Sequence, residues 1–600
     1  MSWRINKRVP IDATKIAIIA TVGPPVFKSK EDNSLAELIE AGVTAFRINF
    51  SHVTEEGKLK DNGEIDKYNY QQIIDLIDTI RVLEENLHLP IPIIMDLKGP
   101  EIRVKRVVEY NSKEKKIIED QDCALINESS ITYLCQIPDN ENDAEHYINK
   151  KLHEASNKGE DFVIVYVTYY EGNVLKEIKG GNRIRIDDGR IELKVLERDT
   201  AREYIKCRVV DGGLIKTSKS VNLPDRKESD YSIQDSQFRP KIIERDLKDI
   251  RQRFHVDFIA QSFVRSKEDI ELLYDSLTKI YNSQDNKVPY YPPPKIIAKI
   301  ETKYAVKMED GERERFKRIL EDTCTFGIMI GRGDLGGELP GGIPEVPGTQ
   351  KDLIELSNRV GKPVIVATQM LESMIKSPVP TRAEAQDIWS AIRQGADAVM
   401  LSGETAGGKN PKKAVKIMKD IIRKADLDVD YYRERFNNEY VTGNTRSDTK
   451  PKTAVEVVGY PVVALAEQSK SPYILTYATK GWSATKISRF RPKEPKILAF
   501  TSNEQTARIL RLLYGLYPVL MESTSGLTDL PRERSDVIRL CRLMMNEICE
   551  NDSKLCDFSG KPENCPQEHC DRFVVATFAH EKPPGQWDDS RVLLVFKRDE

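Results

Sequence analysis

Residues 363–402, "PVIVATQMLESMIKSPVPTRAEAQDIWSAIRQGADAVMLS", contain two short apolar segments joined by a longer segment of helical period. The first segment, 363–368, and the last, 397–402, are rich in aliphatic residues and have the length of buried strands. Residues 382–393 have apolar positions at helical spacing. A strand, a helix and a second strand in this order are typical of a parallel βα unit.

The same alternation recurs through the first 425 residues. The segments that resemble buried strands are 15–21, 45–50, 91–96, 257–263, 295–300, 326–331, 363–368 and 397–402. Helical period is found in 70–87, 267–281, 351–360, 382–393 and 412–425. Eight such units predict an α/β fold, the (β/α)₈ TIM barrel.

One connection of this barrel is far longer than a loop, because residues 97–256 separate the third strand from the fourth. Within it, residues 162–168, 182–197 and 203–210 resemble antiparallel strands separated by Gly, Asp and Asn. We therefore expect an all-β lid domain at 99–222, inserted on the barrel face where active sites lie.

After residue 425 the strand pattern restarts with "SPYILTYAT", "PKILAFTS", "YPVLME" and "FVVATFAH", which predicts a C-terminal α/β domain. A polar stretch there contains Cys549, Cys556, Cys565, His569 and Cys570, but their spacing lacks the paired C-x₂-C of a zinc knuckle. The expected division is an N-terminal segment 1–12, the barrel at 13–98 and 223–424, the lid at 99–222 and the C-terminal domain at 425–600.

Composition argues against several classes of partner. The chain has 92 basic and 95 acidic residues, so no global field favours nucleic acid or an anionic membrane. No apolar run approaches the ~18 residues of a membrane span. Nine cysteines, an odd number and widely scattered, suit reduced thiols better than a disulfide framework. We expect a cytoplasmic protein.

Charged and hydroxyl side chains follow most of the barrel strands. Lys299 and Glu301 lie two residues apart and therefore point the same way, and Asp334 follows the next strand. Two carboxylates from neighbouring strands suit Mg²⁺, whereas the alternative is a Lys–Glu ion pair beside an exposed aspartate.

In "GRGDLGG", 331–337, the glycines let backbone N–H groups approach an anion. An adhesion tripeptide would need an exposed extracellular loop.

A second set of polar residues ends the strands at 45–50 and 91–96. Arg47, Asn49 and Ser51 alternate onto one face, and Asp96 ends the neighbouring strand. Asn and Ser oxygens with one carboxylate suit K⁺, while arginine suits phosphate. The alternative is a hydrogen-bonded rim without a ligand.

Taken together, the strand endings resemble a known family. In order and spacing, the motifs of pyruvate kinases are similar to "RINFSH", "MDLKGPEIR", "IDDG", "SVNLP", "AQSFVR", "AKIE", "GRGDLG", "ATQMLESMI", "PTRAEAQD" and "MLSGETA". The resemblance implies a barrel, a lid and a C-terminal domain, usually assembled as a homotetramer. It also implies a phosphotransferase that converts phosphoenolpyruvate and ADP to pyruvate and ATP, the final step of glycolysis.

The resemblance implies a role for each matching residue. The ligands of Mg²⁺ or Mn²⁺ would be Glu301 and Asp334. Substrate would contact Arg47, Ser262, Lys299, Gly333, Asp334 and Thr368, with Lys299 on the moving phosphoryl group. K⁺ would be bound by Asn49, Ser51, Asp96 and the carbonyl of Leu97. The nucleotide would contact Asn49, Phe50, Ser51, His52, Arg103 and Lys219.

Other implied features are a proton path and an effector site. Thr368, through water, with Ser402 and Glu404, would deliver a proton to the enolate. In "ATKGWSATKISRFRP", Thr479, Lys480 and Ser483 would hold a phosphorylated effector, although Lys480 and Trp482 replace the usual residues. A glutamate at the position of Glu101 is typical of family members that require K⁺. Leu97, in contrast, stands where many of these K⁺-dependent members have threonine. Two alternatives stay open, a Mg²⁺-dependent lyase on a similar barrel and a catalytically inactive scaffold.

Overall fold

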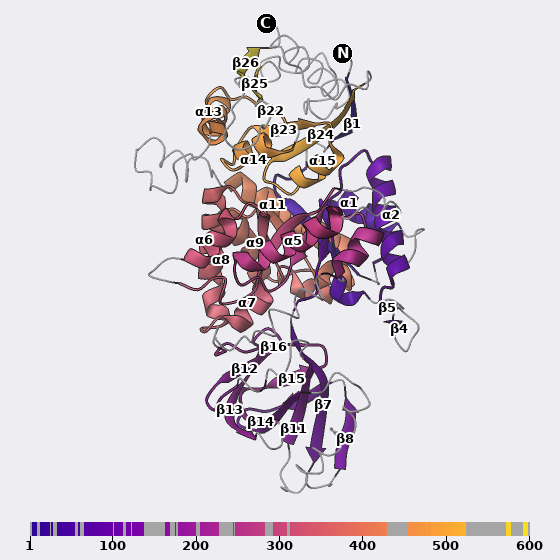
Figure 1. The fold of residues 1–600 in the computed structure, drawn as a ribbon, viewed down its shortest axis with the longest axis vertical. Coiled ribbons are helices and arrows are strands. Elements are labelled where there is room, and N and C mark those ends of the chain that lie inside the picture. The colour runs from indigo at the N-terminus through magenta and orange to yellow at the C-terminus, as the bar shows by residue number, and fades with distance from the viewer. Residues whose placement is uncertain are drawn as a thin grey trace.

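A computed structural model places most of the chain. It describes residues 3–8, 13–23, 26–27, 33–53, 58–59, 65–99, 101–111, 116–121, 123–136, 162–168, 175, 178–199, 204–226, 244, 246–282, 292–308, 313–428, 454–478, 480–523, 572–577 and 592–597. The barrel occupies the middle of the molecule, with the lid at one end and the C-terminal domain at the other (Figure 1).

The central barrel is closed by eight parallel strands, as the sequence predicts. Their spatial order is β17-β18-β19-β20-β21-β2-β3-β6. Their bounds are β2 Ala17–Val22, β3 Ala45–Asn49, β6 Ile93–Asp96, β17 Phe258–Gln261, β18 Lys295–Ile300, β19 Thr325–Gly331, β20 Val364–Ala367 and β21 Ala398–Leu401. All eight predicted strands are confirmed, most of them one or two residues shorter than expected.

Helices surround this barrel. They are α1 Ser34–Ala41, α2 Tyr70–Asn86, α5 Lys267–Asn282, α6 Glu314–Glu321, α7 Arg332–Glu338, α8 Val346–Val360, α9 Arg382–Gln394, α10 Gly403–Ala406 and α11 Pro411–Asp428. Short 3₁₀ turns are η1 Phe50–His52, η4 Ile343–Glu345 and η5 Glu372–Ile375, and a hairpin pairs β4 Lys58–Leu59 with β5 Ile65–Lys67.

Local sequence fixes both ends of α9. Thr381 and Glu384 form a capping box, in which each side chain accepts a hydrogen bond from the backbone N–H of the other residue. Gly395 ends the helix in a left-handed conformation with φ of 101°.

Alternate side chains of each barrel strand belong to two different apolar cores. In β2, Ile19 belongs to the apolar cluster inside the barrel, while Ile18 packs in the layer between strands and helices.

The lid is an all-β domain. Eight strands follow the order β11-β10-β14-β13-β12-β16-β7-β8, with a further pairing of β11 with β7, and β9 pairs with β15. The bounds are β7 Ile102–Asn111, β8 Lys116–Gln121, β9 Cys123–Ile126, β10 Ile131–Gln136, β11 Phe162–Thr168, β12 Arg183–Ile186, β13 Ile191–Asp199, β14 Tyr204–Asp211, β15 Gly213–Lys216 and β16 Ser220–Asn222.

Two details of the lid differ from the sequence prediction. The β10–β11 pair is parallel rather than antiparallel. The run 182–197 is two strands, because Asp187 and Asp188 adopt left-handed φ values of 56° and 58° and, with Gly189, turn the chain back.

The C-terminal domain contains a six-stranded sheet of order β1-β24-β23-β22-β25-β26. Its elements are α13 Ala454–Gln468, β22 Tyr473–Tyr477, α14 Trp482–Ser488, β23 Lys496–Thr501, α15 Glu504–Leu510, β24 Leu516–Ser523, β25 Arg572–Thr577 and β26 Val592–Lys597. The N-terminal strand β1, Trp3–Arg8, pairs antiparallel with β24, so the first residues of the chain complete the last domain.

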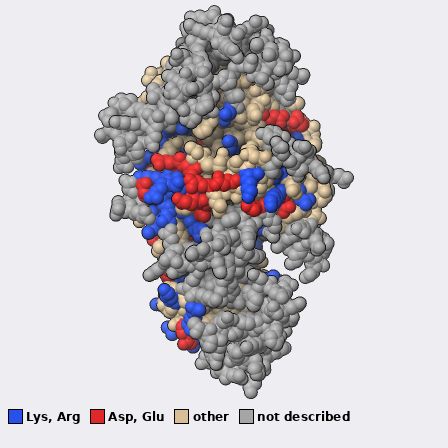
Figure 2. Space-filling model, viewed as in Figure 1, with Lys and Arg blue, Asp and Glu red and all other residues tan. Residues whose placement is uncertain are grey.

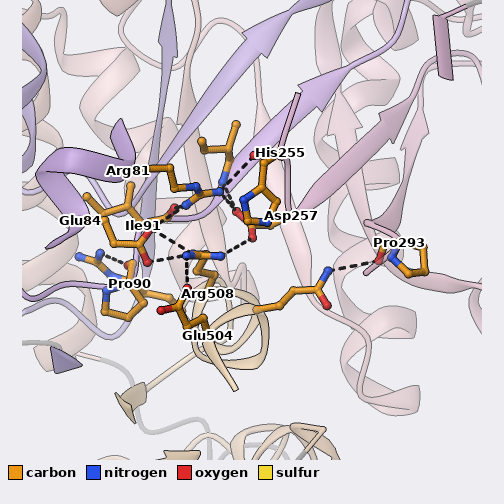
Figure 3. Close-up of polar contacts among 12 residues, drawn as sticks. Arg81, Glu84, Pro90, Ile91, His255, Asp257, Pro293, Glu504 and Arg508 are labelled. Atoms are coloured by element: carbon orange, nitrogen blue, oxygen red, sulfur yellow. Dashed lines mark hydrogen bonds and ion pairs between the residues drawn. The ribbon is translucent and has the colours of Figure 1, made fainter. Parts of the chain in front are cut away.

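A buried charge network joins the C-terminal domain to the barrel. Arg508 of α15 donates from Nε to Glu84 of α2 at 2.8 Å, and its Nη1 lies 3.7 Å from Asp257. Arg81 also pairs with both carboxylates (Figure 3). A second arginine, Arg491, is 1% exposed and pairs at 3.0 Å with an aspartate that precedes β21. Both arginines therefore contact the ends at which barrel strands begin.

The visible surface of the barrel carries side chains of both charges, in keeping with the nearly equal numbers of basic and acidic residues in the sequence. On the face shown in Figure 2, basic and acidic side chains are intermixed over the barrel. Among the described residues, no helix is both long and apolar enough to cross a membrane.

Candidate active site

Asp96, at the end of β6, is the centre of a polar cluster at the barrel mouth. Its Oδ1 accepts hydrogen bonds from Lys299 Nζ at 3.1 Å and from the Ser262 hydroxyl at 3.2 Å. Its Oδ2 accepts one from Arg47 Nε at 2.8 Å. Burial alone would raise the pKa of Asp96, but the charges of Lys299 and Arg47 outweigh it and lower that pKa below the usual value. Asp96 is therefore an anion that fixes two cations.

Lys299 is held by three oxygen atoms at or just beyond the ends of β6, β17 and β18. Besides Asp96, its Nζ contacts the Ser262 hydroxyl at 2.8 Å and Glu301 Oε1 at 3.0 Å. Burial would lower the pKa of Lys299, but the charges of Asp96 and Glu301 outweigh it and raise the pKa above its usual value. The structure thus presents a fixed ammonium with a side chain only 10% exposed.

Glu301 and Asp334 bring negative charge to the same place. Burial is the main cause that raises the pKa of each carboxyl, and for Asp334 the charges of Glu301, Glu101 and Asp188 raise it further. A Cβ at Gly331 would lie 2.6 Å from Glu301 Oε1, so the end of β19 runs directly against this carboxylate. Repelling carboxylates of this kind suit a divalent cation, whose charge would offset their repulsion.

The described residues contain no group of three or more His, Cys, Asp or Glu side chains placed to hold a metal. The protein would therefore supply two carboxylates, and other oxygen ligands would have to complete the coordination. Two carboxylate ligands from the protein are typical of Mg²⁺ sites in which the substrate also binds the ion.

The start of α7 and the end of β20 form a second part of the site. The Gly333 N–H donates to Thr368 Oγ1 at 3.0 Å, which joins two of the residues that the resemblance predicts to contact substrate. Thr368 and Gln369 have φ values of 67° and 54°, a conformation that is costly for these residues and common at functional sites. Sequence reasoning assigned no role to Arg332, yet its Nη2 donates to the Thr368 carbonyl at 2.6 Å and holds this turn.

The lid reaches this part of the barrel through the turn at 187–189. Asp188 accepts a hydrogen bond from Gln369 Nε2 at 3.3 Å and one from the Ser220 hydroxyl at 3.2 Å. Lys219 Nζ lies 2.5 Å from Asp187. Neither aspartate was a predicted site residue, although the motif "IDDG" marked the segment. The structure thus brings the predicted lid lysine beside the barrel mouth.

Comparison with known proteins finds family models and curated relatives that match this chain. A family model described as pyruvate kinase, barrel domain, matches residues 13–138 and 136–415, and one described as pyruvate kinase, alpha/beta domain, matches 456–562. A curated "Pyruvate kinase" of Staphylococcus aureus (strain MRSA252) is 33% identical over 509 residues, covering 84% of this chain and 72% of the relative. One of Staphylococcus saprophyticus is 34% identical over 511 residues, covering 85% and 72%.

The chain belongs to the pyruvate kinase family. Membership confirms the resemblance seen in the strand-end motifs, and it fits the barrel, lid and C-terminal α/β domain described above. Members of this family are phosphotransferases, so an inactive scaffold or a lyase is the less supported alternative.

The set expected to bind K⁺ in a pyruvate kinase has other partners here. Both oxygens of Asp96 accept hydrogen bonds from cationic side chains, and the Leu97 carbonyl accepts one from the Ser262 hydroxyl at 3.0 Å. Asn49 Oδ1 accepts the Ser51 N–H at 3.1 Å. Ser51 does not continue the strand alternation, because β3 ends at Asn49 and the chain turns into η1. In this arrangement Asp96 is therefore already paired with Lys299 and Arg47.

The residues expected to bind nucleotide differ in their exposure to solvent. Arg103, 45% exposed in its side chain, pairs with Glu101 and donates to the Ser218 carbonyl at 2.6 Å. Phe50 is 1% exposed and packs against Tyr70, so its side chain is part of the core rather than of a binding surface. The side chain of His52 lies outside the described residues.

The expected proton path has no continuous hydrogen bonding. Glu404 accepts the backbone N–H groups of Leu371 at 2.9 Å and Ser402 at 2.7 Å. The Ser402 hydroxyl is buried and has no hydrogen-bond partner among the described residues, and the Thr368 hydroxyl donates to the Ala367 carbonyl at 2.6 Å. In the part of the chain that the structure describes, no hydrogen bond joins the Thr368 and Ser402 hydroxyls to each other or to the Glu404 carboxylate, so a path through these side chains would need water.

The expected effector loop is described only in part. Thr479 lies outside the described residues, as do the cysteines of the polar insertion. Lys480 is exposed, and Ser483 is buried with its hydroxyl donating to the Tyr477 carbonyl at 3.0 Å. Trp482 is 53% exposed. The Ser483 hydroxyl therefore already has an internal partner.

Proposed function

We propose that this chain transfers the phosphoryl group of phosphoenolpyruvate to ADP and produces ATP and pyruvate, as the final step of glycolysis. The single observation that carries the proposal is the Lys299 ammonium, fixed by Asp96, Ser262 and Glu301 at the barrel mouth. Phosphoryl transfer depends mainly on positioning and charge neutralisation, and a cation fixed in advance supplies both.

Divalent metal would be held by Glu301 and Asp334, whose raised pKa values fit the binding of a cation. When bound, Mg²⁺ or Mn²⁺ supplies positive charge beside the phosphoryl oxygens and the forming enolate. The backbone of Gly333 and Asp334 with the Thr368 hydroxyl would bind the substrate carboxylate.

In the reaction, the bond between the phosphorus and the enol oxygen breaks and a bond to the terminal phosphate oxygen of ADP forms. Lys299 stabilises the phosphoryl oxygens, and Arg47 and the lid residues Arg103 and Lys219 bind phosphate groups. The enolate then takes a proton on carbon to become pyruvate. We assign that proton to water near Thr368 and Ser402, with Glu404 holding the local backbone.

K⁺ dependence is part of the proposal. Glu101 is negative and cannot replace a cation, and the oxygens of Asn49, Ser51 and Leu97 lie at one end of the barrel beside Asp96. Because the Asp96 carboxylate is already paired with Lys299 and Arg47, the ion would have to share or displace one of these partners. A homotetramer, a cytoplasmic location and a phosphorylated effector also stay proposals, which rest on the family.

The test is pyruvate formation from phosphoenolpyruvate and ADP with Mg²⁺, coupled to lactate dehydrogenase, at equal ionic strength in K⁺ and in Na⁺. We expect activity in K⁺ that largely disappears in Na⁺. Equal activity in both salts would contradict the K⁺ site but not the kinase. Absence of pyruvate in both, with folded protein, would contradict the proposed function and favour the inactive scaffold.

A further inference from the structure

Arg185 is a charged side chain buried where the lid meets the barrel. It belongs to β12, and its side chain is only 7% exposed. In Figure 1, β12 lies at the end of the lid nearest to α7. A buried guanidinium is costly unless its N–H groups are satisfied, so its partners show what it holds in place.

The partners of Arg185 come from both domains. Its Nε donates to Glu192 of β13 within the lid at 2.9 Å. Its Nη1 donates to the main-chain carbonyls of Gly337 at 3.2 Å and Leu339 at 2.6 Å, and Nη2 donates to that of Pro340 at 3.2 Å. These three carbonyls are at the end of α7, whose first residues form the candidate active site. The planar guanidinium thus connects the lid to the segment that carries Asp334.

Other contacts of the same hairpin are weaker or less central. Arg183 donates to the Pro340 carbonyl at 2.8 Å, but the rest of its guanidinium pairs with Asp225. Arg190 lies 2.8 Å from Glu372, with side chains 51% and 40% exposed, and exposed pairs contribute little. Arg185 is therefore the most buried cationic contact between this hairpin and the barrel among the residues described.

The turn that follows β12 carries the lid groups nearest to the site. Asp187 pairs with Lys219, and Asp188 contacts Gln369 beside the Gly333 cradle. A Cβ at Gly333 would lie 3.0 Å from an Asp188 oxygen, so the fit is close. A shift of the hairpin would move Lys219 away from the mouth, whereas Lys299 and Thr368 would stay on the barrel.

We propose that Arg185 is a positioning residue for phosphoryl transfer, which latches the β12–β13 hairpin to the end of α7 and so places Lys219 for the nucleotide. This inference rests on the proposed function. Lysine could replace this arginine only in part, because one ammonium cannot reach Glu192 and all three carbonyls at once. The latch acts on the ADP side of the reaction, since the predicted phosphoenolpyruvate contacts are on the barrel.

The test compares Arg185→Gln and Arg185→Lys with Arg208→Gln, a control on the exposed face of the lid strand β14. Steady-state kinetics are measured with ADP and phosphoenolpyruvate varied separately. Hydrogen exchange of the amides at 187–190 is followed without substrates, and urea unfolding reports on the fold.

We expect Arg185→Gln to lower kcat/KM for ADP by about 10- to 100-fold, as small misplacements of a positioning group do. The KM for phosphoenolpyruvate should change far less, Arg185→Lys should recover part of the loss, and exchange at 187–190 should rise. Arg208→Gln should behave as the wild type.

Unchanged kinetics and exchange in Arg185→Gln would overturn the proposal. Equal losses for both substrates together with a lower unfolding midpoint would also overturn it, because they indicate a merely structural role. A folded wild-type chain without activity would contradict the proposed function instead. In that case the exchange at 187–190 still decides the latch, since a rise supports it and no change rejects it.

Discussion

Individual residues at the barrel mouth gain their chemistry from their neighbours. Lys299 is close enough to Asp96, Ser262 and Glu301 to be fixed without substrate, and the same ion pairs hold it protonated. The sequence predicted Lys299 and Glu301 on one side of a strand, from a spacing of two. It did not predict that Asp96 would pair with Lys299 and Arg47, because that contact joins positions 203 and 49 residues apart.

Replacement of Lys299 by Met should remove most of the activity. We expect kcat to fall by about 100- to 1,000-fold, as for the loss of one preorganised donor at developing charge. The coupled pyruvate assay measures this. Lys351→Met, on the exposed side of α8, is the control. A loss below about tenfold, far under the range for such donors, would show that Lys299 does not stabilise the transferring group.

At the scale of elements, an aspartate precedes each of two barrel strands, β17 and β21, and binds the backbone of the neighbouring strand. Asp257 precedes β17 and accepts the Ile93 N–H at the start of β6, at 2.8 Å. Asp397 precedes β21 and accepts the Val364 N–H at the start of β20, at 2.9 Å. In both cases one carboxylate satisfies the first backbone donor of the neighbouring strand. The strands were predictable from apolar periodicity, whereas this pairing of their starts depends on which strands become neighbours.

His255 beside the start of β17 should give stability a pH dependence. Burial, with the charge of Arg81 as a second cause, lowers the pKa of His255 from 6.5 to about 4. Between these values the unfolded state binds more protons than the folded state, so lowering the pH through this window reduces stability. From pH 7 to pH 5, His255→Gln should lose less of its urea unfolding midpoint than the wild type.

The control for this pH effect is His88→Asn, because His88 is exposed and Asn tolerates its left-handed φ of 50°. It should keep the wild-type pH dependence. If His255→Gln and the wild type lose stability equally between the two pH values, His255 is not the group responsible.

At the scale of the whole molecule, the C-terminal domain is bound to the barrel by both charge and apolar contact. Arg508 enters between Glu84 and Asp257 (Figure 3). Ile509 and Leu512 join the apolar cluster inside the barrel. These contacts close the end of the barrel opposite to the active site. The two domains are therefore expected to unfold together rather than separately.

Arg508→Met should destabilise this junction. It leaves Glu84 and Asp257 buried with Arg81 paired to both and with the charge of Arg511 near Glu84, and breaking one side of a buried charge pair costs about 3–5 kcal/mol. Urea unfolding, followed by fluorescence, measures the loss. Arg208→Met on the lid is the matched control. An unfolding midpoint equal to that of the wild type would mean that the remaining arginines compensate both carboxylates.

The sequence by itself determined the barrel, its eight strands and the all-β lid, because each depends on local periodicity. It also predicted the candidate metal carboxylates, because Glu301 and Asp334 follow the ends of neighbouring predicted strands. Only the tertiary structure decided that β1 joins the C-terminal sheet, that Asp96 pairs with Lys299 and Arg47, and that Arg185 and Arg508 link domains. These contacts join residues far apart in the chain. Their partners are carbonyls and carboxylates that become neighbours only when the barrel closes and the domains pack on it.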